Sequence, residues 1–275
     1  VTTVALLDSC ILYRLPLCDM LMHAAEAYLC RFHVTEKILD DVVAHKGMGA
    51  DSAQEFKELF LESFPESLKE VDSRFEKNMP NHSSARHVLA AAVVPPHCEV
   101  IVTFNLHHFK REDLKMFEDV CAIHPDDFLC SLCDEYGDGA LLSVIKKQAK
   151  DLAQPKVVPI YLLDKLHKQG IQRFTGRITT HGFTNEIVKI ARKTLKKLGK
   201  DGTNNERIFS GKSYLLKSSR GKLHVETKDK KRVLVDYSPN QKRVSLVPSD
   251  IIKFRDFEKE LDRQLAELVA ERETA

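Results

Sequence analysis

Two stretches of the sequence decide the fold: Ser84-Ala85-Arg86-His87-Val88-Leu89-Ala90-Ala91-Ala92 and Val100-Ile101-Val102-Thr103-Phe104-Asn105. The first has the apolar and small residues of a short buried helix, and the second is typical of a buried strand. A further strand of this kind, Val4-Ala5-Leu6-Leu7-Asp8, ends in a carboxylate. Because the carboxyl ends of parallel strands meet at one edge of a sheet, we expect Asp8 and Asn105 to lie on the same edge.

The rest of the first half supplies alternating strands and helices. Short strands are expected at Arg31–Val34 and Val120–Ile123, and helices at about 19–28, after Thr35, and across 52–77, where Pro65 splits the run. Alternation of this kind favours an α/β fold in which helices cover both faces of a parallel sheet.

The sequence predicts three regions: an α/β domain at 1–135, a helical extension at 136–170 and a small α+β domain at 171–275. The extension is broken at Pro155 and Pro159. In the last region Thr184 is expected to cap a basic helix, Glu186 to Leu198. Four strands of an antiparallel meander are expected next, at 213–217, 223–227, 232–237 and 243–247, and then a helix capped by Ser249.

Charge is unevenly distributed along the chain. Residues 171–247 hold 19 Lys and Arg against 6 Asp and Glu, whereas residues 1–170 hold 18 against 26. A basic segment of this size is typical of a protein that contacts a polyanion, so we expect RNA contact here, and a protein partner is the alternative. The candidate nucleic-acid-binding residues are Lys189, Arg192, Lys193, Lys196, Lys197 and Arg220.

The composition also limits the compartment and rules against a membrane. No apolar run reaches the roughly 18 residues of a membrane span, and no basic-then-apolar leader is present, so neither membrane insertion nor secretion is expected. Several of the seven cysteines lie in apolar stretches, as reduced, buried thiols of a cytoplasmic protein do.

Carboxylates are the residues that suggest a chemistry. Clustered Asp and Glu hold Mg²⁺ or Mn²⁺ against a phosphodiester and lower the pKa of a bound water. Asp8 is the first candidate for such a cluster. The helix after Thr35 offers a second acid, but spacing alone does not choose among Glu36, Asp40 and Asp41.

Several ordered motifs together resemble the PIN-domain ribonucleases, and more narrowly the VapC-type toxins of bacterial toxin–antitoxin pairs. The resemblance covers about residues 3–170. Its motifs are Leu6–Tyr13, Leu17–Leu21, Thr35–Val42, Arg86–Ala92, Val102–Phe109 and Pro125–Leu129. It implies a PIN-like fold, a Mg²⁺- or Mn²⁺-dependent endoribonuclease activity, a homodimer and an antitoxin partner.

The resemblance also implies roles for individual residues. Asp8 matches the first family acid, and Asp41 best matches the helix acid. Ala85 stands where the family has its third acid, and His108 stands where many members have a fourth. Thr103 and Asn105 match the Thr and Asn at the strand end.

Two of the four family acids are therefore absent. His108 could still ligate a metal or orient a water, whereas Ala85 has no substitute nearby. Ala85 is either an introduced substitution or the residue of a natural, inactive protein, and the intact motif around it favours the first. We therefore expect an endoribonuclease that Ala85 has impaired. The alternative is a non-catalytic nucleic-acid-binding or regulatory protein on a degenerate PIN fold.

Overall fold

The computed structural model describes residues 2–117, 119–152, 157–197, 207–210, 214–219, 222–227, 233–238, 241–244, 246–256 and 258–259. Two units divide the chain, Val1–Ala153 and Gln154–Ala275. The division falls within the segment 136–170 that the sequence assigns to a helical extension.

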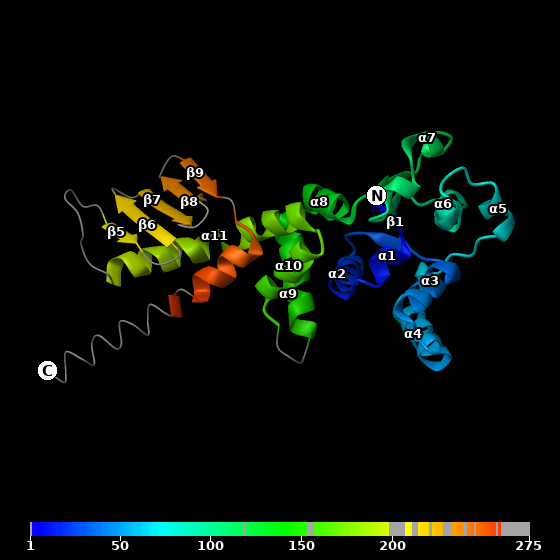
Figure 1. Cartoon of the computed structure of the whole chain (residues 1–275), viewed down its shortest axis with the longest axis horizontal. Helices are drawn as coiled ribbons and strands as arrows, with labels where there is room; N and C mark the ends of the chain where they lie inside the picture. Colours follow the sequence, from blue (N-terminus) through cyan, green and yellow to red (C-terminus); the bar gives the residue numbers. More distant parts are fainter. Residues whose placement is uncertain are drawn as a thin grey trace. The chain divides into compact units, whose positions relative to one another are not determined.

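The first unit is built on a four-stranded parallel sheet (Figure 1). Its strands are β1 (Val4–Leu7), β2 (Arg31–His33), β3 (Val100–Val102) and β4 (Cys121–Ile123), in the order β2-β1-β3-β4. β1 pairs with β3 in the register Leu6↔Ile101, and both residues are fully buried. The predicted α/β class and all four predicted strands of this sheet are confirmed.

The helices of the first unit follow the predicted order. They are α1 (Ser9–Leu12), α2 (Leu15–Glu26), α3 (Glu36–Lys46), α4 (Ala50–Ser63), α5 (Ser73–Lys77), α6 (Arg86–Val93), α7 (Arg111–Leu114), α8 (Pro125–Tyr136) and α9 (Asp138–Asp151). Three 3₁₀ turns accompany them, η1 (Pro65–Ser67), η2 (Ser83–Ala85) and η3 (Leu106–His108).

Local sequence explains where these helices begin and end. The Thr35 hydroxyl accepts a hydrogen bond from the Ile38 N–H at 3.2 Å, so it caps α3 as expected. α3 ends at Gly47, whose φ of 61° is a left-handed conformation that glycine adopts without strain. Pro65 separates α4 from the elements after it, also as expected.

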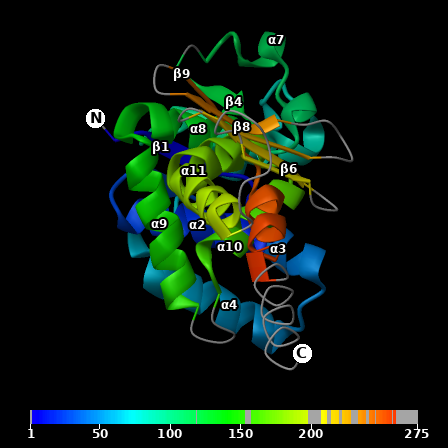
Figure 2. The ribbon, with the colours of Figure 1, turned by 90° about the vertical axis from the view of Figure 1, so that its left-hand side faces the viewer.

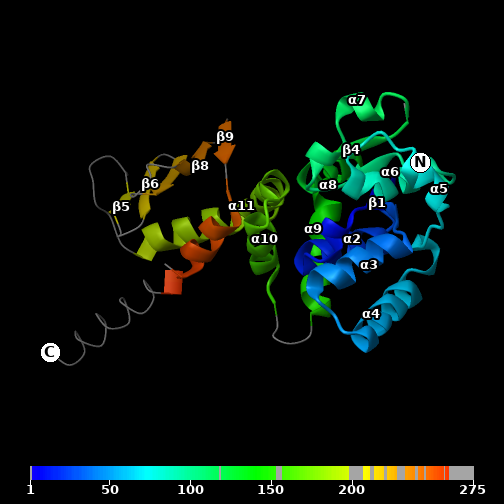
Figure 3. The same cartoon turned by 45° about the vertical axis from the view of Figure 1, so that its right-hand side comes forward.

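Packing holds the helices on the sheet and on one another. α6 contacts β1 and β3, and its run Leu89–Ala92 is fully buried, so small side chains let this helix lie close to the sheet. α9 packs along α2 (Figure 2), where the Gln148 amide donates to the Asp19 carboxylate at 2.8 Å. α3 packs beside α1 (Figure 3), which brings the α3 acids towards the carboxyl end of β1.

The second unit joins helices to a five-stranded antiparallel meander. It contains α10 (Pro159–Lys168), α11 (Gln172–Lys197) and the strands β5 (Arg207–Ser210), β6 (Tyr214–Ser219), β7 (Lys222–Thr227), β8 (Val233–Ser238) and β9 (Gln241–Val244). Residues 248–256 are helical. α11 packs on this sheet (Figure 1), and Leu223, Val225 and Ile187 are among its buried residues. The predicted meander is confirmed, and β5 is a strand that the sequence did not suggest.

Two predicted helix starts are wrong. Ser249 does not cap the last helix, because residue 248 is already helical. Thr184 does not cap a helix, because its hydroxyl donates to the Thr180 carbonyl inside α11, which begins at Gln172. The buried positions Phe174, Ile178 and Phe183 continue the apolar face of the helix through this region. The predicted end at residues 198–199 lies outside the described residues. Within the described part of the chain, no helix has the length and hydropathy of a membrane span.

Candidate active site

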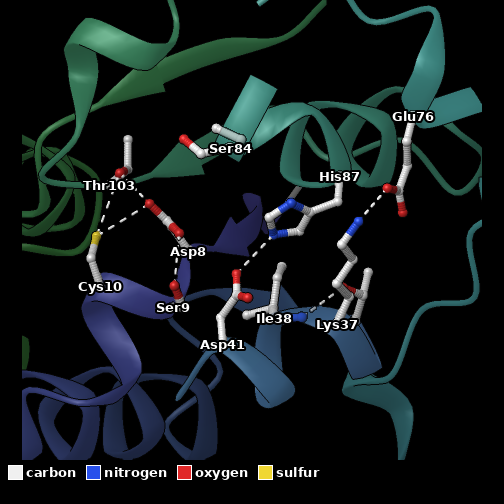
Figure 4. Close-up of polar contacts among 12 residues, drawn as sticks. Asp8, Ser9, Cys10, Lys37, Ile38, Asp41, Glu76, Ser84, His87 and Thr103 are labelled. Carbon is white, nitrogen blue, oxygen red and sulfur yellow. Dashed lines mark hydrogen bonds and ion pairs between the residues drawn. The ribbon is translucent and has the colours of Figure 1, made fainter. Parts of the chain in front are cut away.

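Asp8 lies at the carboxyl end of β1 and is 6% exposed. Three neighbouring side chains donate hydrogen bonds to its carboxylate (Figure 4). The Thr103 hydroxyl bonds to Oδ2 at 2.6 Å, the Cys10 thiol to Oδ2 at 3.3 Å, and the Ser9 hydroxyl to Oδ1 at 3.3 Å. The carboxylate is thereby fixed in one orientation, although it is almost removed from solvent.

Thr103 and Asn105 place a second strand end in the same network. Thr103 follows β3 and is fully buried, and its hydroxyl oxygen accepts the Asn105 N–H at 2.9 Å. The Phe104 N–H donates to the Cys10 sulfur at 3.3 Å. The expectation that Asp8 and Asn105 lie at one edge of the sheet is therefore met, with Asn105 joined through its backbone.

Cys10 is held as a thiol in this network. Burial, and then the negative charge of Asp8, raise the pKa of Cys10 to about 12. At neutral pH its sulfur therefore carries the proton that it donates to Asp8, and it does not act as a nucleophile.

The three acids on α3 differ in what they contact. Glu36 and Asp40 lie 3.6 Å and 2.5 Å from the ammonium of Lys57 on α4. Asp41 instead lies near α6, where its Oδ2 is 3.2 Å from Nε2 of the buried His87 (Figure 4). Nε2 of His87 is buried and has no hydrogen-bond partner among the described residues. Among the alternatives that spacing left open, Asp41 is thus the acid that contacts the helix beginning at Ala85.

Ala85 precedes α6 at its N-terminus and is 4% exposed. Its carbonyl accepts a hydrogen bond at 3.0 Å from the side-chain amide of Asn81, which is itself buried. Ser84, next to Ala85, appears in the same close-up as Asp8 and Asp41 (Figure 4). The methyl group of Ala85 supplies no ligand atom at this position.

His108 belongs to a cluster of three imidazole rings. It stacks on His82 with ring centroids 4.4 Å apart and meets His107 edge-on at 4.1 Å. Burial lowers the pKa of His108, the charges of His107 and His82 lower it further, and the Asp8 carboxylate opposes them. The neutral imidazole of His108 is therefore favoured.

These residues do not form a complete site for a divalent cation. Among the described residues, no group of three or more His, Cys, Asp and Glu side chains has the geometry to hold a metal ion. Mg²⁺ and Mn²⁺ prefer several oxygen ligands, and Asp8 and Asp41 are the two carboxylates that the resemblance assigns to this role. The side chains present therefore do not fit the metal that the resemblance implies.

Arg14 is a residue of this region that sequence reasoning missed. Its guanidinium lies over the ring of Phe104, 4.3 Å from the centroid, and 5.8 Å from the centroid of Tyr13. A single arginine in an apolar stretch is an ordinary sequence feature, so no pattern marked it. The available signal was the pair of aromatic residues at positions 13 and 104, one directly after α1 and the other just after β3.

The structure does not describe the side chains of three predicted nucleic-acid-binding residues on α11, Arg192, Lys196 and Lys197, and Arg220 lies outside the described residues. Lys189 on α11 is exposed. Lys193 lies 2.9 Å from the Glu258 carboxylate. Part of the basic charge of α11 is thus paired within the unit.

Comparison with known proteins identifies two stretches of similarity. Residues 125–180 match a family described as the VapC50 C-terminal domain. Over 91 residues the chain is 45% identical to a protein of Mycobacterium tuberculosis (strain ATCC 25618 / H37Rv) named "Putative ribonuclease VapC50". The resemblance to VapC-type PIN-domain proteins is confirmed. The match covers 33% of this chain and 52% of the relative. No solved structure matches the chain.

Proposed function

We propose that this chain is an endoribonuclease of the VapC type whose divalent-metal site is incomplete because Ala85 replaces an acid. The observation that carries the proposal is the buried Asp8 carboxylate, which Thr103 fixes at the carboxyl end of β1 through a 2.6 Å bond. The similarity to a protein named as a ribonuclease supports the reaction class.

The other site residues fit this proposal in distinct ways. Asp41 on α3 supplies the second acid, since Glu36 and Asp40 are engaged by Lys57. Asn105 supports Thr103 from its backbone, and His108 occupies the place of the fourth acid as a neutral imidazole. In nucleases with a complete acid set, Mg²⁺ or Mn²⁺ stabilises the charge on the phosphate and lowers the pKa of the attacking water.

Restoring the missing acid tests the proposal. The Ala85→Asp protein and the chain as given are incubated with labelled single-stranded RNA in Mg²⁺, in Mn²⁺ and in EDTA. We expect cleavage in the Ala85→Asp protein alone, abolished by EDTA and by adding Asp8→Asn. Ala85→Asn is the matched control, because it has nearly the same size without the charge. A folded Ala85→Asp protein that cuts no RNA in either metal contradicts the proposal.

A non-catalytic nucleic-acid-binding protein is the second candidate. The observation in its favour is that no metal-binding group of three side chains occurs among the described residues. Such a protein binds RNA equally well with and without EDTA, and Ala85→Asp leaves it unable to cleave. The cleavage assay above therefore separates the two candidates when it is paired with a binding measurement.

The proposal also includes partners and a location. RNA is the substrate, and the basic residues of 171–275 contribute to holding it, Lys189 among them; these contacts are electrostatic and salt-dependent. An antitoxin protein and a homodimer follow from the resemblance, and a cytoplasmic location follows from reduced cysteines and an RNA substrate. Light scattering coupled to size exclusion tests the homodimer, since a monomer across the working concentrations contradicts it.

A further inference from the structure

We infer that Arg14 binds a backbone phosphate of single-stranded RNA beside Asp8, and this inference rests on the proposed function. Three observations support it: the guanidinium lies over one aromatic ring and near a second, it has no carboxylate partner among the described residues, and it is tied to the strand end that carries Thr103.

A frame of rings from several elements fixes the guanidinium. Phe104, just after β3, lies beneath it at 4.3 Å, and His124, just after β4, meets the Phe104 ring edge-on at 4.9 Å. The ring of Tyr13, whose centroid lies 5.8 Å from the guanidinium, stacks on His45 of α3 at 3.9 Å. A stacked guanidinium leaves its N–H groups in the plane of the fork, which is the geometry that binds a phosphate in a bidentate manner.

The charge of Arg14 has no anionic partner among the described residues. Arg14 is half-buried, none of the ion pairs in the described ranges includes it, and its Nε is buried without a hydrogen-bond partner. A desolvated charge and an unpaired donor are both costly, and the aromatic faces offset only part of this cost. A phosphate that reaches the exposed part of this half-buried side chain would balance the charge of the guanidinium, whereas the buried Nε stays closed to an external anion.

Phe104 ties this cation to the proposed active site. It follows Thr103, which bonds to the Asp8 carboxylate, and its own N–H donates to the sulfur of Cys10. Asp8 and Arg14 therefore contact two consecutive residues, Thr103 and Phe104, that follow β3. A carboxylate cluster repels the phosphates of RNA, so a cation at this edge offsets the repulsion and selects a phosphodiester over a neutral ligand.

The test is RNA binding by the 275-residue chain in EDTA, measured by the fluorescence anisotropy of a labelled single-stranded RNA at several salt concentrations. Arg14→Ala is compared with Arg31→Ala, which removes an exposed arginine at the amino end of β2, where no site residue lies. We expect Arg14→Ala to weaken binding about tenfold more than Arg31→Ala. In Arg14→Ala the slope of log K against log salt concentration should become shallower by about 0.7, the value for one phosphate contact on a single strand.

Two further variants separate charge from geometry. Arg14→Lys keeps the charge but loses the planar fork, and Phe104→Leu removes the ring, so both should weaken binding by less than Arg14→Ala. Equal affinities and equal salt slopes for folded Arg14→Ala and Arg31→Ala would overturn the inference, as would binding of inorganic phosphate at Arg14 without any RNA affinity. If Ala85→Asp cuts RNA but Arg14→Ala binds normally, the proposed function stands and this inference fails. If Ala85→Asp does not cleave RNA but Arg14→Ala loses RNA affinity, the proposed nuclease activity fails and the role of Arg14 in RNA binding stands.

Discussion

Thr103 donates its hydroxyl hydrogen to Oδ2 of Asp8 across 2.6 Å, and this bond joins the residue after β3 to the residue after β1. The register of the two strands places the pair, since Leu7 lies opposite Val102 and each site residue comes one position later. The position of the main candidate acid is thus set by the pairing of two buried strands.

Removing this bond should destabilise the protein. Thr103→Val keeps the shape of the side chain but leaves a buried carboxylate oxygen with one donor fewer, which costs about 1.5–3 kcal/mol of the free energy of unfolding. Urea denaturation near pH 7 measures it. Thr103→Ser keeps the hydroxyl and loses a methyl group, so it should cost about 1 kcal/mol. A Thr103→Val protein at least as stable as Thr103→Ser would show that the bond contributes little.

His108 should make stability depend on acidity. Because burial, His107 and His82 lower its pKa below the ordinary 6.5, the unfolded chain takes up a proton at a higher pH than the folded one. The free energy of unfolding therefore falls as the pH drops from about 6.5 towards the lower pKa of the folded state. Denaturation at pH 7.5 and 5.5 measures this fall in the free energy of unfolding, and the fall should be smaller in the His108→Asn variant.

The control for this prediction is His97→Asn, which removes an exposed histidine outside the ring cluster. It should leave the difference between pH 7.5 and 5.5 unchanged. If His108→Asn and His97→Asn have the same effect on that difference, the ring cluster does not penalise protonation of His108.

The thiols should differ sharply in reactivity. Burial raises the pKa of Cys10, Cys18 and Cys30 to about 12, so almost none of each is thiolate at pH 8. Burial and the charge of Glu99 also raise the pKa of Cys121, but this thiol is exposed to the reagent. Alkylation of the native chain at pH 8, read by mass spectrometry, should modify Cys121 first. Cys121→Ser should remove the early product, and all seven should react in urea. Rapid modification of Cys10 in the folded chain would contradict the packing around Asp8.

Sequence patterns could predict the first unit because its signals are local. The strand runs at Val4 and Val100, the cap at Thr35 and the break at Pro65 each act within a few residues, and each is confirmed. Spacing could not separate Asp41 from Glu36 and Asp40, because the contacts that distinguish these acids come from a lysine of α4 and a histidine of α6.

Features that depend on distant contacts were missed. Lys69 is 4% exposed, and its ammonium donates to the carbonyls of Val94 and Pro96, which no pattern around residue 69 reveals. Arg14 is similar, since its partner ring lies 90 positions away in the chain, on Phe104. α11 was divided at Thr184 because a capping residue is a strong local signal, whereas the buried face of the helix is set by the sheet that it packs against.

The continuity of α11 gives the last prediction. Gly176 lies inside this helix, and a Cβ added there would meet the Leu246 carbonyl oxygen at 3.6 Å, an ordinary van der Waals contact. Since alanine favours a helix interior by about 1 kcal/mol over glycine, Gly176→Ala should raise the free energy of unfolding by up to that amount. Gly170→Ala is the control: φ is 96° there, so alanine is strained and should destabilise the chain. Thermal unfolding by circular dichroism compares the two. A loss of stability in Gly176→Ala would indicate that the helix does not continue through this position, as the signal at Thr184 had suggested.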